Sequence, residues 1–264
     1  MNQGTALKTE AIIPLIEKGF KDGVTCLELD SCHLTLLPFG QSYQKQNASH
    51  TILVYEDLFI KNQGFYHSLI SSKLGLNKTI YGRETDIRVL SKADFTQFCN
   101  EFHYLKSTNT KVRFGLYHQE ELVMVCGFSK PRKMYRDDKQ YRSAELIRSC
   151  TKFGLTVTGG LSKLINQFVQ QEKPDDIITY IDKDFFSGKG FEALGFKLYK
   201  ELPPSLTWLE KETGDRFTSD QLMKRGKLQS DEYQKITTYP KGFIPMQNTG
   251  NKKMVQYFAN DNLH

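Results

Sequence analysis

The alternation of apolar and polar residues predicts an α+β segment at the start of the chain. Short runs that alternate with a period of two are typical of half-buried strands, and longer runs with a 3.6-residue period are typical of helices. Pro14 interrupts the first helical run, and Gly75 is a stop signal near the end of the second. We expect residues 1–78 to form this segment, with strands at 24–29, 33–37 and 51–59 and helices at 10–20 and 61–77.

Residues 79–264 begin with a strand, a helix and a hairpin. The helix carries apolar residues at helical spacing and opens with Ser91 and Asp94, which suit an N-terminal cap. Two alternating runs joined by a short polar stretch predict the hairpin. The charged residues 130–142 are expected to be a linker. The expected elements are a strand at 79–90, a helix at 91–105 that ends near His103, and hairpin strands at 111–118 and 121–129.

The centre of the chain predicts a strand, a helix and a return strand. An apolar run at 144–150 is followed by Gly159 and Gly160, by an amphipathic helix at 161–171 and by a buried strand at 177–182. This spacing favours a parallel pair of strands joined by a right-handed crossover. We therefore predict an α/β or mixed α+β fold.

The last part of the chain predicts further strands and a short helix. Residues 205–210 form one expected strand, and a helix is expected to begin near Thr218. Residues 242–261 resemble two short strands joined at 248–251.

Composition and charge leave several partner classes open. The chain has 39% apolar and 25% charged residues and a formal net charge of +6. These values suit a folded cytoplasmic protein, and the charge permits an anionic partner without requiring one. No signal segment or membrane-spanning run is evident. The five cysteines form an odd set without a CxxC pair, which favours reduced thiols and predicts no metal site.

A loop before the central helix is suited to an anion. The unpaired N–H groups and the dipole at a helix N-terminus attract negative charge, and glycines allow a ligand to approach the backbone closely. A double glycine before a helix is also a common turn, and this simpler interpretation stays open.

The order of these elements, together with the motif FEALGFKLY at 191–199, resembles the GNAT superfamily of acyl-CoA N-acyltransferases. The resemblance implies a GNAT-like mixed sheet and acetyl-CoA or another small-molecule acyl donor as the cofactor. It also implies a donor-binding loop, although the family's Arg/Gln-x-x-Gly-x-Gly/Ala pattern is not reproduced. The implied donor-binding residues are Val157, Thr158, Gly159, Gly160 and Lys163.

A closer resemblance covers residues 80–264. The segments NEFHYL, ELIRSCTKFG, TVTGGLSKLI, TYID and NTGNKKMVQYF are similar to the GNAT-like domain found with Vsr-type nucleases in phage and homing-endonuclease-related proteins. They are also similar to Mom-type DNA modification proteins. Residues 50–80 faintly resemble the end of the associated nuclease domain. Carried over by position, the implied catalytic residues are His103, Arg148, Ser162 and Asp182.

These residue types suit acyl transfer to an amine, and each also has a structural interpretation. A His or an Asp can remove a proton from the amine, and an Arg can hold a phosphate or carboxylate. His103 is alternatively a helix-closing residue, Arg148 an ion-pair partner of Glu145, and Ser162 a helix cap. For Asp182 a functional role is favoured, because sites in open α/β sheets gather at the carboxyl ends of strands, and Asp184 is its competitor.

Two further features bear on the chemistry. Phe191 stands where the superfamily often has a proton-donating tyrosine. Three alternatives stay open: Tyr180 or water protonates the leaving group, the donor is not a thioester, or catalysis has been lost. The stretch 130–142 combines cations with Tyr135 and Tyr141, a composition that suits DNA or RNA and equally suits a solvated loop. Its predicted nucleic-acid contacts are Lys130, Arg132, Lys133, Arg136 and Arg142.

Three functions are therefore consistent with the sequence. The leading hypothesis is an acyl- or aminoacyl-transferase acting on an amine, including that of a nucleic-acid base. The alternatives are a nucleic-acid-binding module without catalysis and an ordinary CoA-dependent N-acetyltransferase. The sequence leaves the acceptor and the oligomeric state open.

Overall fold

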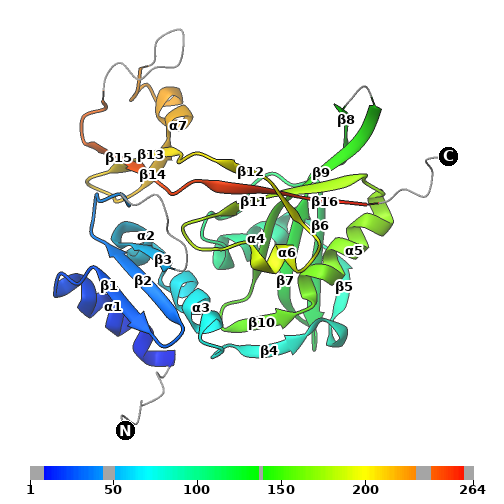
Figure 1. The fold of residues 1–264 in the computed structure, drawn as a ribbon, viewed down its shortest axis with the longest axis horizontal. Coiled ribbons are helices and arrows are strands. Elements are labelled where there is room, and N and C mark those ends of the chain that lie inside the picture. Colours follow the sequence, from blue (N-terminus) through cyan, green and yellow to red (C-terminus); the bar gives the residue numbers. More distant parts are fainter. Residues whose placement is uncertain (1–8, 44–50, 137–138, 230–238, 259–264) are drawn as a thin grey trace.

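A mixed β-sheet forms the centre of the molecule (Figure 1). The computed structural model describes residues 9–43, 51–136, 139–229 and 239–258. In these ranges the strands of the sheet follow the order β12-β16-β11-β9-β7-β6-β5, and β8 pairs with the first half of β9. The strands are β5 (Asp86–Val89), β6 (Val112–His118), β7 (Glu121–Phe128), β8 (Arg132–Arg136), β9 (Lys139–Thr151), β11 (Asp176–Asp182), β12 (Lys197–Leu202) and β16 (Asn251–Tyr257).

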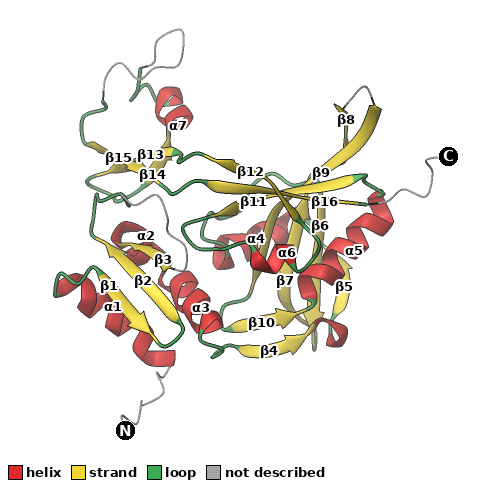
Figure 2. Ribbon diagram, viewed as in Figure 1, coloured by secondary structure: helices red, strands yellow, loops and turns green. Residues whose placement is uncertain are grey.

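Helices cover both faces of this sheet (Figure 2). On one face α4 (Lys92–Phe102) packs Phe95 and Phe98 against Val125 of β7. On the other face α5 (Gly160–Glu172) buries Leu164, Ile165 and Phe168 in the main core. The short helix α6 (Lys189–Glu192) precedes β12. The predicted mixed sheet flanked by helices is thus confirmed.

The crossover from β9 to β11 is parallel, as its length predicts. Ser143–Glu145 pair with Asp176–Ile178, and all the other contacts of the sheet are antiparallel. Ser91 accepts a hydrogen bond from the Asp94 N–H and caps α4, also as predicted. Apolar periodicity and capping residues were therefore sufficient to locate these elements.

The N-terminal segment is α+β, as predicted, and has its own apolar core. Pro14 lies in the first turn of α1, where a helix tolerates proline because the missing N–H would have no partner there. The predicted strand at 51–59 ends early, since its second half forms a helix. The elements are η1 (Thr9–Ala11), α1 (Ile12–Lys21), β1 (Cys26–Leu29), β2 (Cys32–Leu37), β3 (Thr51–Tyr55), α2 (Glu56–Lys61) and α3 (Gln63–Lys73).

Three predictions of local structure were wrong. The single strand at 79–90 is divided by η2 (Gly82–Glu84), and its first half, β4 (Lys78–Tyr81), pairs with β10 (Leu155–Thr158) instead of joining the large sheet. The expected linker at 130–142 forms the ribbon of β8 and β9. The two C-terminal strands are not a hairpin: β16 enters the central sheet, and the strand before it joins a separate three-stranded sheet.

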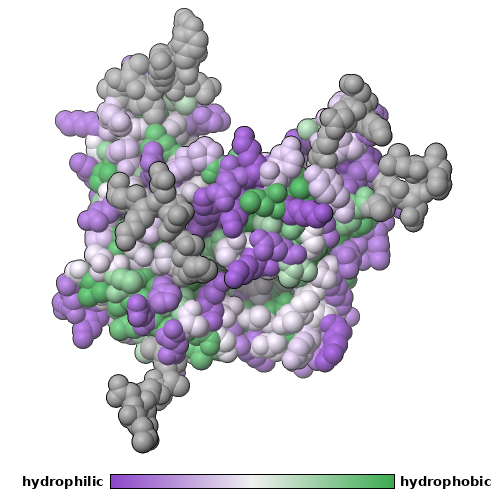
Figure 3. All heavy atoms as spheres, in the orientation of Figure 1, coloured by the Kyte–Doolittle hydropathy of each residue, from purple (hydrophilic) through white to green (hydrophobic). Residues whose placement is uncertain are grey.

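That small sheet closes one side of the molecule. Its strands are β13 (Leu206–Glu210), β14 (Arg216–Thr218) and β15 (Phe243–Gln247), with α7 (Ser219–Lys224) after β14. Thr218 caps α7, which confirms the predicted helix start near that residue. In the space-filling view the surface is largely hydrophilic, with small separate hydrophobic areas (Figure 3). Within the described ranges no helix has the length and apolarity needed to cross a bilayer.

A buried ion pair joins the small sheet to the N-terminal segment. Arg216 of β14 donates two hydrogen bonds, of 2.7 and 2.9 Å, to the carboxylate of Asp57 in α2. The Asp57 residue is 3% exposed, and the guanidinium lies over the Tyr55 ring. Such two-pronged geometry compensates for removing both charges from water.

Loss of this pair should destabilise the fold strongly. In Asp57→Asn the Arg216 charge stays buried without its counter-ion, and we expect the free energy of unfolding to fall by about 3 kcal/mol. Urea denaturation measures this change. The control Lys61→Met breaks the exposed pair with Asp215 and should cost under about 1 kcal/mol. If the free energy of unfolding fell equally in the two variants, the buried pair would stabilise the fold no more than the exposed one, contrary to this prediction.

Candidate functional site

The strands β9 and β11 separate beside a large cavity. Their ladder ends at Glu145 and Ile178, although β9 continues to Thr151 and β11 to Asp182. Beyond this point, residues of both strands line a cavity of about 1330 Å³. A wedge between parallel strands exposes backbone groups that no neighbouring strand uses, and these are available to a ligand.

A β-bulge lies at the point of separation. Gly127 of β7 pairs with Arg148 and Phe128 pairs with Leu146, so that Ile147 is the extra residue. Thr179 of β11 donates a hydrogen bond of 3.1 Å from Oγ1 to the Leu146 carbonyl oxygen. The bulge therefore lies in the part of β9 that lines the cavity.

Asp182 ends β11 at the cavity wall and is bonded to a tyrosine. The Tyr104 hydroxyl donates a hydrogen bond of 2.7 Å to Oδ2 of Asp182. Burial and the neighbouring Asp184 carboxylate raise the pKa of Asp182 to about 6, while the bond from Tyr104 lowers it. Asp182 is therefore ionised at neutral pH, and as a base it is stronger than an ordinary aspartate.

The turn after β11 is fixed in place by several contacts. The N–H of Asp184 donates to Oδ1 of Asp182 over 3.0 Å, and the Asp184 carboxylate accepts from the Thr249 backbone and hydroxyl. The Asp184 carbonyl oxygen accepts from Leu53 of β3, and the Phe185 ring packs edge-on to Tyr104. With 3% exposure, Asp184 supports Asp182 in this arrangement rather than reaching solvent.

His103 lies directly after α4 and lines the same cavity. Its Nδ1 accepts a hydrogen bond of 3.1 Å from the Leu105 N–H, so the proton of the neutral ring is on Nε2. Burial and the positive charges of Arg148 and Lys106 lower its pKa to about 4. In this state the ring has an N–H donor at Nε2. His103 is also the C-cap residue of α4, since its backbone N–H donates to the Cys99 carbonyl oxygen, and the Lys106 side chain donates to the Asn100 carbonyl oxygen.

Arg148 also lines the cavity, just past the bulge. Its Nε donates to the Lys106 carbonyl oxygen over 3.1 Å, and Nη1 donates to its neighbour Ile147 over 2.9 Å. Arg148 and Glu145 both lie in the described part of the chain, and they form no ion pair with each other. His103, Arg148 and Asp182 therefore line one cavity.

Ser162 and the predicted donor-binding segment lie apart from this lining. Of residues 157–163, which are all described, Leu161 is the one that lines the cavity. Gly159 has φ +77° and begins α5, and a Cβ on Gly82 would lie 2.9 Å from the Gly159 carbonyl carbon. Lys163 donates to the carbonyl oxygens of Gly82 and Thr85. The positive φ of Gly159 and the close packing of Gly160, whose Cβ would lie 2.6 Å from Val157, account for the double glycine. Donor binding by Val157, Thr158, Gly159, Gly160 and Lys163 and the catalytic role of Ser162 stay predictions.

Phe191 and Tyr180 both contact the cavity. The Phe191 ring is edge-on to Phe196, at 5.3 Å between centroids, and has no proton to give. Tyr180 lies two residues before Asp182 on β11, is 45% exposed, and has a pKa raised by burial and by Glu145. Its hydroxyl is therefore protonated at neutral pH.

The predicted nucleic-acid strip divides between the body and the β8–β9 ribbon. Lys130 pairs with Glu172 at 3.4 Å, and Arg142 donates to the Lys173 carbonyl oxygen at the end of α5. Arg132 and Lys133 are exposed on the ribbon, which extends away from the body (Figure 1). The side chain of Arg136 lies outside the described part of the chain.

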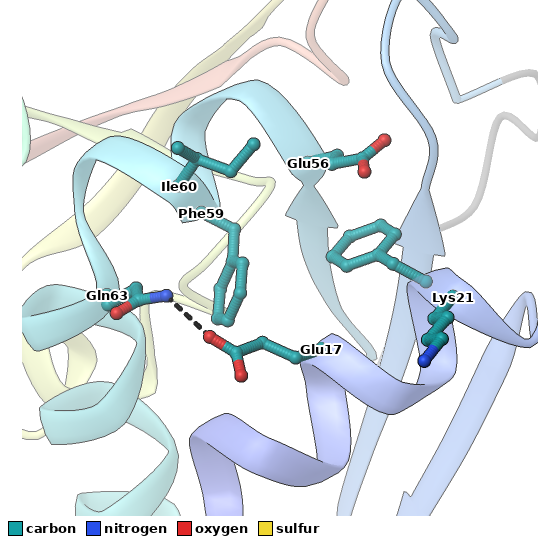
Figure 4. Close-up of a pocket in the computed structure, with 7 residues that line it drawn as sticks. Glu17, Lys21, Glu56, Phe59, Ile60 and Gln63 are labelled. Atoms are coloured by element: carbon teal, nitrogen blue, oxygen red, sulfur yellow. Dashed lines mark hydrogen bonds between the residues drawn. The ribbon is translucent and has the colours of Figure 1, made fainter.

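A smaller cavity of about 250 Å³ lies between α1 and α2 (Figure 4). Its acidic side chains already have partners. Glu17 accepts a hydrogen bond of 2.9 Å from Gln63, and Glu56 accepts one of 2.8 Å from the Phe39 N–H. The larger cavity brings His103, Arg148 and Asp182 together from different elements, and it is therefore the candidate site.

Sequence reasoning did not identify Tyr104, Lys106 or Arg216 as site residues. Tyr104 follows a helix that is rich in aromatic residues, so its pattern matches that of a core residue. Lys106 and Arg216 lie in short polar stretches of ordinary composition. The NEFHYL segment was the one available signal, because it places Tyr104 directly after His103.

Comparison with known proteins yields structural matches of low similarity. No protein-family model matches the sequence, and no curated protein matches it significantly. The ribosomal-protein-S18-alanine N-acetyltransferase from Escherichia coli is 10% identical, covers 68% of this chain and 99% of its own, and gives a TM-score of 0.38. An HPA2-related acetyltransferase from Corynebacterium glutamicum is 13% identical, with coverage of 68% and 99% and a TM-score of 0.39.

A spermidine N-acetyltransferase SpeG chimera from Vibrio cholerae and hSSAT gives a similar result. It is 12% identical, covers 66% of this chain and 95% of its own, and has a TM-score of 0.38. TM-scores below 0.5 at such identities do not establish a family, an activity or a set of site residues. The chemistry of the site therefore depends on the contacts within this chain.

The hydrogen bond from Tyr104 and the charge of Asp184 should act on Asp182 in opposite directions. We expect Tyr104→Phe to raise the pKa of Asp182 above about 6, because the ionised carboxylate loses a donor. Asp184→Asn should lower it, because a like charge is removed. Carboxyl carbon NMR titration measures both changes, and Tyr180→Phe serves as the control. Shifts of the same sign in the two variants would rule out this account of the site.

Proposed function

We propose that this chain is an N-acyltransferase that moves an acyl group from an acyl-CoA to an amine in the cavity between β9 and β11. The observation that carries the proposal is the position of Asp182. It is a carboxylate with a pKa of about 6, bonded to Tyr104, and it lines the cavity at the end of β11, beyond the residues where β9 and β11 separate. A base with a pKa near neutrality, placed in a wedge of this kind, suits removal of a proton from an attacking amine.

In this proposal Asp182 accepts the proton that the amine nitrogen loses as it bonds to the acyl carbon. The hydrogen bonds from Tyr104 and from the Asp184 N–H hold the carboxylate in one orientation. Restricting its orientation favours transfer, because the acceptor oxygen is already in place when the nitrogen attacks. His103 contributes its Nε2 proton as a donor rather than accepting one.

The separated edge of β9 fits the donor. An acyl-CoA supplies an activated thioester at the end of an arm that contains amides. Backbone groups between Leu146 and Ser149 lie in the cavity wall, where they can bond those amides as a neighbouring strand would. Leu161 extends the wall to the first turn of α5. Binding of the donor's phosphates near residues 157–163 is part of the proposal.

The leaving sulfur needs a proton from a group other than Phe191. Tyr180 is the side chain on the cavity wall best suited to this step, since its hydroxyl is protonated at neutral pH. Water is the alternative donor. The acceptor is an amine on a small molecule, a protein or a nucleic-acid base.

Removal of the base should abolish transfer and leave donor binding intact. We expect Asp182→Asn to lower kcat by about 10²- to 10⁴-fold, with an unchanged Kd for acetyl-CoA. For an acceptor whose amine stays uncharged over this range, kcat/KM of the wild type should rise with pH through about 6 as Asp182 ionises. Initial-rate transfer assays measure kcat and kcat/KM, and calorimetry measures the Kd for acetyl-CoA. Undiminished turnover in Asp182→Asn would refute the role of Asp182.

A second candidate function is nucleic-acid binding by the β8–β9 ribbon. Lys133 lies directly across the ribbon from Arg142, and Tyr135 on the same face of β8 is 72% exposed. Like charges in opposite positions destabilise a strand pair, and phosphates between them would relieve the repulsion. A two-stranded ribbon also has the dimensions of the major groove. This ribbon is compatible with transfer to a base and with a module that binds without catalysis.

Salt dependence tests the ribbon directly. If Lys133 contacts a phosphate, Lys133→Gln should weaken binding to duplex DNA and reduce the slope of log K against log salt by about 0.9. Lys200→Gln removes an exposed lysine from β12, at the other edge of the sheet, and should leave the slope unchanged. A slope that falls equally in both variants would indicate non-specific attraction to a basic protein.

A further inference from the structure

The end of the large cavity beside His103 has a concentration of positive charge. Arg148 of β9 and Lys106, in the loop after α4, both line it, and the Arg148 Nε bonds the Lys106 carbonyl oxygen. Among the described residues, neither Arg148 nor Lys106 has an acidic side chain within ion-pair distance. Arg216 and Lys61, which also line the cavity, each have such a partner.

Both cations are held in place by backbone oxygens and keep donors unused by these bonds. Arg148 donates through Nε and Nη1 to two carbonyl oxygens, so that Nη2 is not engaged in them. Lys106 donates to the last turn of α4 through one hydrogen bond of 3.1 Å, and an ammonium group has further protons. A cation in a cavity wall without a counter-ion favours an anion, and the planar guanidinium suits a phosphate or a carboxylate.

His103 adds a third donor to the same place. The bond from Leu105 to Nδ1 leaves the proton of the neutral ring on Nε2. The ring stacks on Tyr104, with 5.3 Å between centroids and 12° between planes. Because the Tyr104 hydroxyl bonds Asp182, the cationic end of the cavity lies one aromatic side chain away from the carboxylate.

We propose that Arg148 and Lys106, with the Nε2 proton of His103, form a subsite for a phosphate or carboxylate group. This subsite rests on the acyl transfer proposed above, and it defines the chemical class of the acceptor. The acceptor is an amine that also carries an anionic group. The amine of this acceptor lies beside Asp182, and its anionic group binds Arg148.

His103 reports on the subsite independently of activity. An anion bound beside Arg148 and Lys106 offsets the charges that lower the pKa of this ring. We expect inorganic phosphate, added to the full chain at constant ionic strength, to raise the pKa of His103 in imidazole NMR titrations. A His103 pKa that is the same with and without phosphate would overturn the proposal.

Variants separate this subsite from general attraction to a basic surface. Arg148→Gln should weaken phosphate binding by about tenfold or more, as expected for loss of a charge-assisted hydrogen bond. Arg148→Lys should restore part of it. Lys200→Gln removes an exposed cation of β12 that is not part of the cavity lining and should have no effect. If Arg148→Gln fails to fold, Lys106→Gln leaves β9 intact and should still weaken binding. If phosphate affinity were unchanged in both Arg148→Gln and Lys106→Gln, the assignment of these residues to an anion subsite would be wrong.

Acetyl-CoA distinguishes the sources of the anion. If phosphate and acetyl-CoA bind together, the subsite serves the acceptor, as proposed. If acetyl-CoA displaces phosphate and Arg148→Gln weakens acetyl-CoA binding, the subsite serves the donor and the assignment to the acceptor is wrong. If acetyl-CoA does not bind while phosphate still raises the pKa of His103, the subsite stands and the acyltransferase function fails.

Discussion

The geometry of the candidate site depends on how the turn after β11 is held. Asp182 begins this turn, and two residues later the Asp184 backbone bonds β3 while its carboxylate bonds Thr249. The Phe185 ring is buried among aromatic residues of the N-terminal segment. A strand end is ordinarily free to fray, so these contacts on both sides are what fix the Asp182 carboxylate against Tyr104.

This constraint makes the N-terminal segment part of the site. The segment has its own core, yet α2 and α3 line the large cavity, and the buried pair of Asp57 with Arg216 joins it to the small C-terminal sheet. The predicted boundary at residue 78 lies at the start of β4, which pairs with β10 immediately before α5. A segment that supplies a cavity wall and holds the turn after β11 is part of the structure of the candidate site, although it carries none of the predicted catalytic residues.

The sequence predicted those features that depend on local patterns. Alternation located β6 and β7, apolar runs located the second half of β9 and β11, and the capping residues Ser91 and Thr218 located two helix starts. The high charge of residues 130–142 led to the wrong prediction of a linker. The β8–β9 ribbon extends away from the body without a buried face, so its strands lack apolar alternation. The separation of β15 from β16 also left no signal, since both strands alternate and only their different partners distinguish them. Tyr104 was missed for a related reason: a core aromatic and a hydrogen-bonding aromatic look the same in a sequence.

The same cavity gives opposite chemical roles to two residues that the sequence treated as equivalent bases. Burial disfavours the charged form of both, and for a carboxylate this raises the pKa whereas for an imidazole it lowers it. The neighbouring charges act in the same directions, with Asp184 beside Asp182 and with Arg148 and Lys106 beside His103. Asp182 thereby becomes a better base, and His103 becomes a neutral donor whose Nδ1 is already occupied. The proposed division between a proton-accepting end and an anion-binding end of the cavity therefore rests on burial and on which charges each group faces.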